Sequence, residues 1–287
     1  MSISRVGVVG CGLMGSGIAE VSARAGVDVV VYQVNDEACD RGRQRISASV
    51  ERAVKAGKLD AETRDEMLAR ISITTDFADF ADRELVIEAI AENEEVKLQV
   101  FATLDAVVTS RDAILASNTS SIPIMKLAMA TSRPEHVVGL HFFNPVPVLN
   151  LVELVPSLLT SPTTAQAARA FASEQLNKLV IDAQDRAGFI VNALLVPYLL
   201  SAIRMLESGF ATASDIDTGT VVGLAHPMGP LALSDLIGLD TVLAIANSLY
   251  EEFRQDAFTP PPMLLRMVEA GLLGRKSGRG FYTYPAR

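Results

Sequence analysis

A glycine-rich turn near the start of the chain constrains its fold more than any other feature. Gly10–Gly15 has the spacing GxGxxG and follows Arg5–Val9, a short apolar run that predicts a buried strand. Ile18–Ala25, directly after the turn, has a helical pattern. Glycines at this spacing allow a tight turn, close approach of a pyrophosphate and close packing of the helix against the strand. We therefore expect a dinucleotide-binding turn; the alternative is a tight turn without a ligand.

The segments after this turn alternate between strand and helix patterns. Val27–Tyr32 is a second continuous apolar run, which is typical of a parallel sheet covered on both faces. Asp36–Arg70 is charged and helical, and Gly57–Asp60 predicts the turn of a helical hairpin within it. The alternation predicts a doubly wound α/β domain. Its other predicted segments are the strands Ile71–Thr74, Leu85–Ala89, Ala113–Ser117 and Val137–Leu140 and helices such as Glu94–Thr109.

The last part of the chain contains helical patterns only. After about Ile181 the predicted strands stop, and the helices that follow are apolar on most faces, as buried helices are. We place a boundary near Gln184, so that residues 1–184 form a dinucleotide-binding domain and residues 185–287 a helical substrate and dimerisation domain. The helices have too few polar positions for solvated faces, which predicts a homodimer. They are Phe189–Glu207, Leu231–Phe253 and Met263–Ala270.

Composition argues against several classes of protein. A net charge of −9 and a pI of about 4.9 give the chain no overall positive field for nucleic acid. Two cysteines and three histidines argue against a disulfide framework and a metal cluster. The longest apolar stretch, Phe189–Leu200, contains Asn192 and Pro197 and is too short to span a membrane. The first residues lack the pattern of a secretory signal, so we expect a cytoplasmic protein without metal, nucleic-acid or membrane partners.

A histidine and a glutamate are spaced to meet across a predicted turn. His141 ends one strand pattern, and Val148–Val155, which contains Glu153, starts another. Both residues lie six positions from Pro147, so a hairpin centred there would set them opposite each other, with Cβ atoms about 4.5–5.5 Å apart. An imidazole oriented by a carboxylate is a general base, which a dehydrogenase needs to remove a hydroxyl proton. The alternative is a structural histidine with an unrelated glutamate.

Three further features each have a functional and a structural interpretation. Ser117–Ser121 follows a strand at the edge where open α/β sheets bind ligands, but it could also cap a helix near Ile122. Asn192 lies in an apolar helix, where its amide could face a ligand carbonyl or be satisfied internally. Six basic residues and one acidic residue lie from Arg41 to Lys58; they could bind substrate phosphates or form a solvated face.

The acidic residue expected after the second strand is missing. The strand pattern ends at Tyr32, and Gln33 follows it. Asp or Glu there would bind the ribose hydroxyls of NAD and repel the 2′-phosphate of NADP. Gln33 can still accept a hydrogen bond, but it removes the repulsion. We expect NAD as the cofactor, and the sequence leaves NADP open.

Together these motifs resemble the 3-hydroxyacyl-CoA dehydrogenase family over nearly the whole chain. The most specific block is Gly139–Pro145, with Glu153 twelve residues after His141. The resemblance implies an α/β fold with a Rossmann-like doubly wound sheet and a helical-hairpin insertion, followed by an all-helical C-terminal domain that forms a dimer. The other matching blocks are Gly10–Gly15, Glu88–Asn93, Ser117–Ser121, Asp185–Asn192 and Gly274–Tyr282.

The resemblance also implies roles for individual residues. His141 would be the base and Glu153 its partner, while Ser120 and Asn192 would hold the reacting oxygens of the substrate. Two positions depart from the family's pattern: Gln33 replaces an acidic residue, and Ala187 replaces a common proline. The implied cofactor-binding residues are Gly10, Gly12, Leu13, Met14, Gly15, Gln33, Glu92, Lys97, Asn144 and Lys276, and the implied substrate-binding residues are Ser49, Lys55, Ser120 and Asn192.

The predicted reaction is reversible hydride exchange between NAD(P) and the 3-hydroxyl or 3-oxo carbon of a short-chain (S)-3-hydroxyacyl-CoA, such as 3-hydroxybutyryl-CoA or acetoacetyl-CoA. One alternative is a β-hydroxyacid dehydrogenase that acts on a free acid and does not need the basic hairpin. The other is a non-catalytic dinucleotide-binding protein, against which the presence of both His141 and Glu153 argues.

Overall fold

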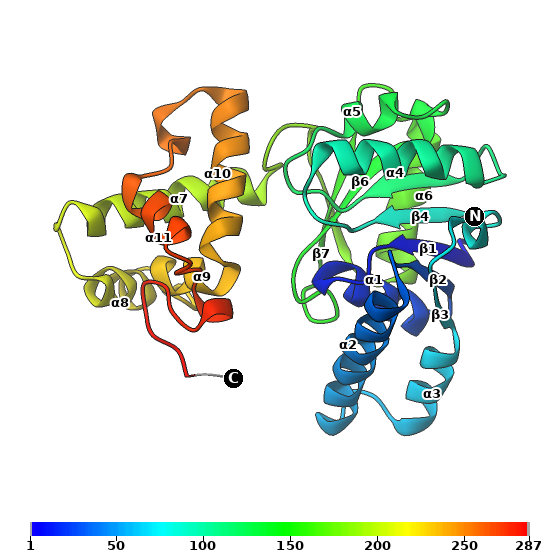
Figure 1. Ribbon diagram of the computed structural model, residues 1–287, viewed down its shortest axis with the longest axis horizontal. Coiled ribbons are helices and arrows are strands. Elements are labelled where there is room, and N and C mark those ends of the chain that lie inside the picture. Colours follow the sequence, from blue (N-terminus) through cyan, green and yellow to red (C-terminus); the bar gives the residue numbers. More distant parts are fainter. Residues whose placement is uncertain (1, 286–287) are drawn as a thin grey trace. The chain divides into compact units, whose positions relative to one another are not determined.

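The structure, a computed structural model, describes residues 2–285. The chain divides between Asp185 and Arg186 into two compact units. We call them the N-terminal and C-terminal units and describe each by itself (Figure 1).

The N-terminal unit is built on one eight-stranded sheet with the order β3-β2-β1-β4-β5-β6-β7-β8. The first six strands in sequence pair in parallel, and β7 runs antiparallel to β6. This is the doubly wound α/β sheet that the alternating pattern predicts. The strands are β1 (Arg5–Val9), β2 (Asp28–Tyr32), β3 (Ile71–Thr74), β4 (Leu85–Glu88), β5 (Ile114–Ser117), β6 (Val137–Phe142), β7 (Leu151–Pro156) and β8 (Leu179–Asp182).

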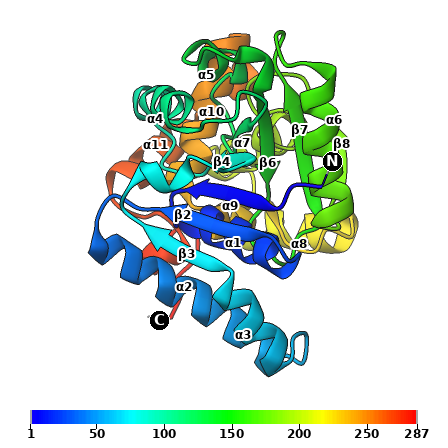
Figure 2. The same cartoon turned by 90° about the vertical axis from the view of Figure 1, so that its right-hand side faces the viewer.

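Helices cover this sheet and extend it with a hairpin. α2 and α3 are joined by the turn predicted around Gly57, and Figures 1 and 2 show the pair reaching beyond β3. Asn35 and Asp60 begin the two helices by accepting hydrogen bonds from backbone N–H groups of their first turns. The helices are α1 (Leu13–Arg24), α2 (Asp36–Lys55), α3 (Ala61–Ala69), α4 (Glu94–Val107), α5 (Ile124–Met129) and α6 (Pro162–Ala170).

Two element boundaries in this unit differ from the predictions by three residues or more. α1 begins at Leu13, because its first turn includes the glycine-rich residues that the apolar pattern could not assign. β7 begins at Leu151, whereas the strand was predicted from Val148, because a turn occupies the residues before it. The edge strand β8 had no prediction of its own; it is four residues long, and none of them is buried.

The C-terminal unit consists of helices packed around a separate apolar core. The prediction of one helix over Leu231–Phe253 is wrong. Gly238 has a φ of +103° and lies between two helices that bend by 97°, so the apolar run conceals a break. α8 was not predicted, because small and polar residues dominate its sequence. The helices are α7 (Val191–Glu207), α8 (Ala213–Gly223), α9 (Pro230–Ile237), α10 (Leu239–Phe253) and α11 (Pro262–Glu269).

Within residues 2–285, no single helix is long and apolar enough to cross a membrane. Helices α9 and α10 reach the length and apolar composition of a membrane span only when the two are counted together, although they bend by 97° at their junction.

Candidate active site

The end of β1 and the start of α1 form the predicted cofactor turn. Gly10 has a φ of +96°, and a Cβ at Gly15 would lie 1.9 Å from the Gly10 carbonyl oxygen, so both positions require glycine. A Cβ at Gly12 would meet no atom within 4 Å, so the backbone there faces open space. The first turn of α1 contains no acidic residue, which leaves its N–H groups suited to an anion. This geometry fits the pyrophosphate of NAD.

The residues around this turn differ in their exposure. Leu13 is 63% exposed, whereas Met14 packs against the core of the N-terminal unit. Gln33 follows β2, where its backbone N–H donates to the carbonyl of Thr74 at 2.9 Å and fixes the strand end. The nearest acidic residues in the sequence belong to the first turn of α2. The end of β2 therefore presents a neutral amide at the position where a carboxylate was expected.

Strands β6 and β7 bring His141 and Glu153 together. The two residues pair directly in the antiparallel register, which confirms the predicted hairpin alignment. His141 Nδ1 lies 2.7 Å from Glu153 Oε2, and the side chains are 8% and 0% exposed. A carboxylate at this distance selects the tautomer with hydrogen on Nδ1, which leaves a lone pair on Nε2. The geometry is that of a general base with its orienting partner.

The turn between these two strands is held by a buried lysine. Lys178 Nζ donates to the carbonyls of Val146 at 2.7 Å and Leu149 at 2.8 Å. Burial lowers the pKa of Lys178, and Arg24 lowers it further. The same turn carries Asn144, which is exposed at the end of β6. Lys178 thus fixes the turn that connects the two strands of the His–Glu pair.

A second polar cluster lies at the carboxyl ends of β4 and β5. Glu88 Oε1 accepts hydrogen bonds from Lys97 Nζ and from the backbone N–H of Ile90, each at 2.7 Å. Its other oxygen accepts from the Ser117 hydroxyl at 2.6 Å. Lys97 also pairs with Glu92 at 3.1 Å, and Glu88 and Lys97 are fully buried. Both predicted residues, Glu92 and Lys97, therefore belong to one network.

Glu92 organises the loop that follows β5. Its Oε1 accepts hydrogen bonds from the Thr119 hydroxyl at 2.5 Å and from the backbone N–H groups of Ser120 and Ser121 at 3.0 and 3.2 Å. The Ser120 hydroxyl lies 3.5 Å from the same oxygen. Burial alone would raise the pKa of Glu92, but Lys97 and these hydrogen bonds hold it below its usual value. The predicted substrate contact Ser120 is thus placed by a carboxylate.

This loop is also tied to the strand that carries His141. Asn118 Oδ1 accepts a hydrogen bond from the backbone N–H of Phe142 at 2.9 Å. Because β5 and β6 are neighbours in the sheet, the hydroxyl-rich loop and His141 lie at one edge. The alternative prediction was that this loop caps a helix near Ile122. The Thr119 hydroxyl does accept a hydrogen bond from the Ile122 N–H, but α5 begins only at Ile124.

The basic residues of α2 divide between ion pairs within the helix and exposed positions. Arg41 pairs with Glu37 and Arg43 with Asp40, as expected for a solvated face. Arg45 instead donates to the carbonyl of Cys11 in the glycine-rich turn at 2.6 Å. The predicted substrate contacts lie further along: Ser49 is half-buried and Lys55 is exposed in the last turn.

The remaining predicted residues belong to the C-terminal unit. Asn192 is 9% exposed in the first turn of α7. Lys276 lies in a short helical turn and pairs with Asp240, with nitrogen–oxygen distances of 2.5 and 2.6 Å. Their roles toward substrate and cofactor stay predictions. Among residues 2–285, no group of three or more His, Cys, Asp or Glu side chains is arranged to hold a metal ion.

Sequence reasoning gave no role to several residues of the site. Glu88 ends an otherwise apolar strand, and an acid at that edge of a parallel sheet was a usable signal. The hydroxyl-rich segment Ser117–Ser121 was a candidate ligand contact, but the hydrogen-bond partners of its first three residues are distant in sequence. These partners are Glu88, Phe142 and Glu92. Lys178 gave no signal, because its carbonyl partners are backbone atoms of another segment.

Two family models match consecutive parts of the chain. The 3-hydroxyacyl-CoA dehydrogenase NAD binding domain matches residues 5–186, and the C-terminal domain of the same family matches residues 188–284. A protein of Mycobacterium tuberculosis named 3-hydroxybutyryl-CoA dehydrogenase is 62% identical over 283 residues, which are 99% of each chain. A protein of Bacillus subtilis named probable 3-hydroxybutyryl-CoA dehydrogenase is 43% identical over 99% of this chain and 98% of its own.

Solved structures agree with these matches. The crystal structure of M. tuberculosis FadB2 superposes with a TM-score of 0.98 at 61% identity and covers 99% of this chain and 100% of its own. The crystal structure of (S)-3-hydroxybutyryl-CoA dehydrogenase from Ralstonia eutropha has a TM-score of 0.94 at 44% identity, with the same coverage. The chain belongs to the 3-hydroxyacyl-CoA dehydrogenase family and is an NAD-dependent enzyme of that family.

Proposed function

We propose that the enzyme interconverts a short-chain (S)-3-hydroxyacyl-CoA and the 3-oxoacyl-CoA, with 3-hydroxybutyryl-CoA and acetoacetyl-CoA as the substrate pair. Its relatives named 3-hydroxybutyryl-CoA dehydrogenase support this size of acyl group. The basic stretch Arg41–Lys58 in the helical hairpin supports a substrate that carries phosphates.

The observation that carries the chemistry is the bond of 2.7 Å between His141 and Glu153. In the oxidative direction His141 Nε2 takes the proton of the 3-hydroxyl group while the hydrogen on C3 leaves as hydride. Bound NAD supplies the hydride acceptor. Glu153 stabilises the imidazolium that forms, and in the reductive direction the same nitrogen returns the proton to the new alkoxide.

The other polar groups of the site would position the reacting atoms. Ser120 is set by Glu92, so its hydroxyl can donate to the 3-oxygen of the substrate. Asn192 would hold a second oxygen of the substrate, and the glycine-rich turn would hold the pyrophosphate of the cofactor. Preorganised donors of this kind favour the transition state over the bound substrate when charge develops on the oxygens that they contact.

A substrate panel tests this proposal. With NADH, we expect turnover of acetoacetyl-CoA and little turnover of free 3-oxo or 3-hydroxy acids. Turnover of the free acids alone would instead support the β-hydroxyacid dehydrogenase alternative. If no acyl-CoA reacted in either direction, the proposed function would be wrong.

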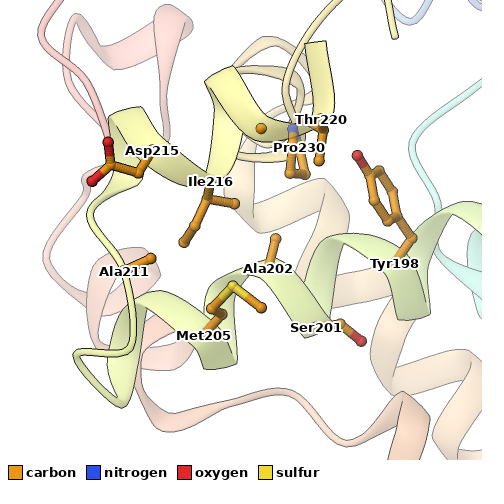
Figure 3. A pocket seen from close by; sticks show the side chains of 10 residues that line it. Tyr198, Ser201, Ala202, Met205, Ala211, Asp215, Ile216, Thr220 and Pro230 are labelled. Atoms are coloured by element: carbon orange, nitrogen blue, oxygen red, sulfur yellow. The ribbon is translucent and has the colours of Figure 1, made fainter. Parts of the chain in front are cut away.

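We also propose a homodimer formed through the C-terminal unit. Leu194, Met205, Val222 and Leu224 are large apolar side chains exposed on or beside α7 and α8. An apolar pocket of about 350 Å³ opens between these helices, lined by Met205 and Ile216 among others (Figure 3). Solvated helices rarely carry such a surface. Sedimentation at micromolar protein should give twice the monomer mass, and a monomer mass would contradict the dimer.

A further inference from the structure

Arg45 differs from the two arginines that precede it on α2. Those two pair with acidic residues of their own helix. The residues three and four positions before and after Arg45 include no acid, so it has no such partner on α2. Its Nη1 instead donates a hydrogen bond to the Cys11 carbonyl at 2.6 Å. Cys11 lies between the first two glycines of the glycine-rich turn, so this bond holds a guanidinium against the turn.

A glycine brings α2 close enough for this contact. Gly42 is buried, and a Cβ there would lie 2.9 Å from Cys11 Sγ and 3.0 Å from Cys11 Cβ. Arg45 follows Gly42 by three residues and therefore shares its helix face. The positive charge acts on the turn as well, since Arg45 lowers the pKa of the Cys11 thiol, although burial raises that pKa to about 11 overall. The position of Arg45 thus follows from the packing of α2 on the turn.

The bond to Cys11 uses one of the five N–H donors of the guanidinium. Arg45 is exposed, and within residues 2–285 it forms no ion pair with a carboxylate. The first turn of α1 contains no acidic residue, and the backbone at Gly12 faces open space. An arginine keeps its charge at every pH at which the protein is folded. The turn therefore has a permanent positive charge beside it that no side chain of this part of the chain neutralises.

We propose that Arg45 is a further cofactor-binding residue, which attracts the pyrophosphate of the nicotinamide cofactor with its charge while its bond to Cys11 keeps it at the turn. The helix N-terminus offers only partial positive charge to a phosphate, so a full charge adds to it. The pyrophosphate is favoured over other phosphates by position. The 2′-phosphate of NADP is expected at Gln33, and the CoA phosphates are expected further along α2, at Ser49 and Lys55.

The test is the Kd for NADH, measured by fluorescence titration without substrate. Arg45→Gln keeps an amide N–H that can donate to the Cys11 carbonyl but removes the charge. At low ionic strength we expect its Kd to be about 3- to 10-fold above that of the wild type. Arg45→Lys keeps the charge without the fork of donors, so its Kd should lie between the two values.

Ionic strength separates the charge from a purely structural role. The screening length falls from about 30 Å at 0.01 M salt to about 3 Å at 1 M. The Kd difference between the wild type and Arg45→Gln should therefore shrink as salt is added. A difference that stays constant with salt would overturn the proposal, because loss of the turn's geometry would then be the cause. Wild-type affinity of Arg45→Gln at low salt would overturn it too.

Three phosphate-bearing ligands show which phosphate Arg45 attracts. Arg45→Gln should raise the Kd for NADPH by the same factor as the Kd for NADH, and it should leave the KM for acetoacetyl-CoA unchanged at saturating NADH. A weaker affinity for NADPH alone would assign Arg45 to the 2′-phosphate. A higher KM for acetoacetyl-CoA alone would assign it to CoA. Either result would overturn the pyrophosphate contact.

Arg70→Gln is the matched control. Arg70 is an exposed arginine whose Nη1 donates to the Gly26 carbonyl at 3.3 Å, at the opposite end of α1 from the glycine-rich turn. The substitution changes the net charge of the protein by the same amount and removes a bond of the same kind. Its Kd for NADH should equal that of the wild type. An equal rise in both variants would overturn the proposal, because net charge alone would then explain the effect.

Discussion

Two buried polar sites at the sheet are built in different ways. The His141–Glu153 pair comes from the register of two adjacent strands, β6 and β7. The Glu88–Lys97–Glu92 cluster is assembled from the ends of β4 and β5, the helix α4 and the loop after β5. In the proposed mechanism the pair transfers the proton, whereas the cluster holds the loop of Ser120 in place. This difference predicts that substitutions in the pair lower kcat most. Substitutions in the cluster should affect both the position of Ser120 and the free energy of unfolding.

The largest expected effect is on the pair. His141→Ala should lower kcat by about 10²- to 10⁴-fold, because the base for the 3-hydroxyl proton is lost. The Kd for NADH should change little, since the glycine-rich turn is separate from β6, whereas the melting temperature should fall, because buried Glu153 loses its histidine partner. Steady-state kinetics would measure kcat, thermal unfolding the melting temperature, and a fluorescence titration the Kd for NADH. Wild-type turnover in the variant would contradict the role of His141.

A change in the cluster should show a different signature. Glu92→Gln removes the charge that Lys97 and the loop N–H groups stabilise, and Glu92 is 34% exposed, so we expect a loss of about 1–2 kcal/mol in unfolding free energy at pH 7. Because its pKa is lowered in the folded protein, this contribution is present above the ordinary carboxyl value of 4.5 and is lost as the pH falls further.

Chemical denaturation of the wild type and the Glu92→Gln variant at several pH values gives the unfolding free energy of each as a function of pH. The two curves should converge below about pH 4.5, the ordinary carboxyl value. Glu94→Gln is the control, since Glu94 is an exposed acid that pairs with Lys126. A constant difference between wild type and Glu92→Gln down to low pH would argue against the charge of Glu92 as the cause.

The smallest effect should come from a position outside both sites. Gln33→Asp places a carboxylate at the end of β2, where it can bind ribose hydroxyls and repel a 2′-phosphate. We expect the ratio of kcat/KM for NADH over NADPH to rise by about tenfold, which corresponds to about 1.4 kcal/mol. Stability at neutral pH and kcat with NADH should stay as in the wild type. An unchanged or reversed ratio would show that Gln33 does not face the ribose.

The same contrast explains how much could be predicted from the sequence. Strand register follows simple counting, so the pairing of His141 with Glu153 was predictable from their distances to Pro147. The glycine-rich turn was predictable because its spacing is specific, and Gly10 and Gly15 each have a steric reason. The partners of Glu88 and the role of Lys178 were not, because those partners are brought together only by the folded sheet. The break at Gly238 was hidden because apolar residues continue on both sides of it.

The central claim is that His141 and Glu153 act as one proton-transferring unit. The most direct measurement is a double-mutant cycle on kcat with acetoacetyl-CoA and NADH, using His141→Ala, Glu153→Gln and the double variant. Residues that act as a unit are non-additive, so the double variant should be no slower than His141→Ala alone. If the two losses multiplied instead, the carboxylate would act independently of the imidazole, and the claim would be contradicted.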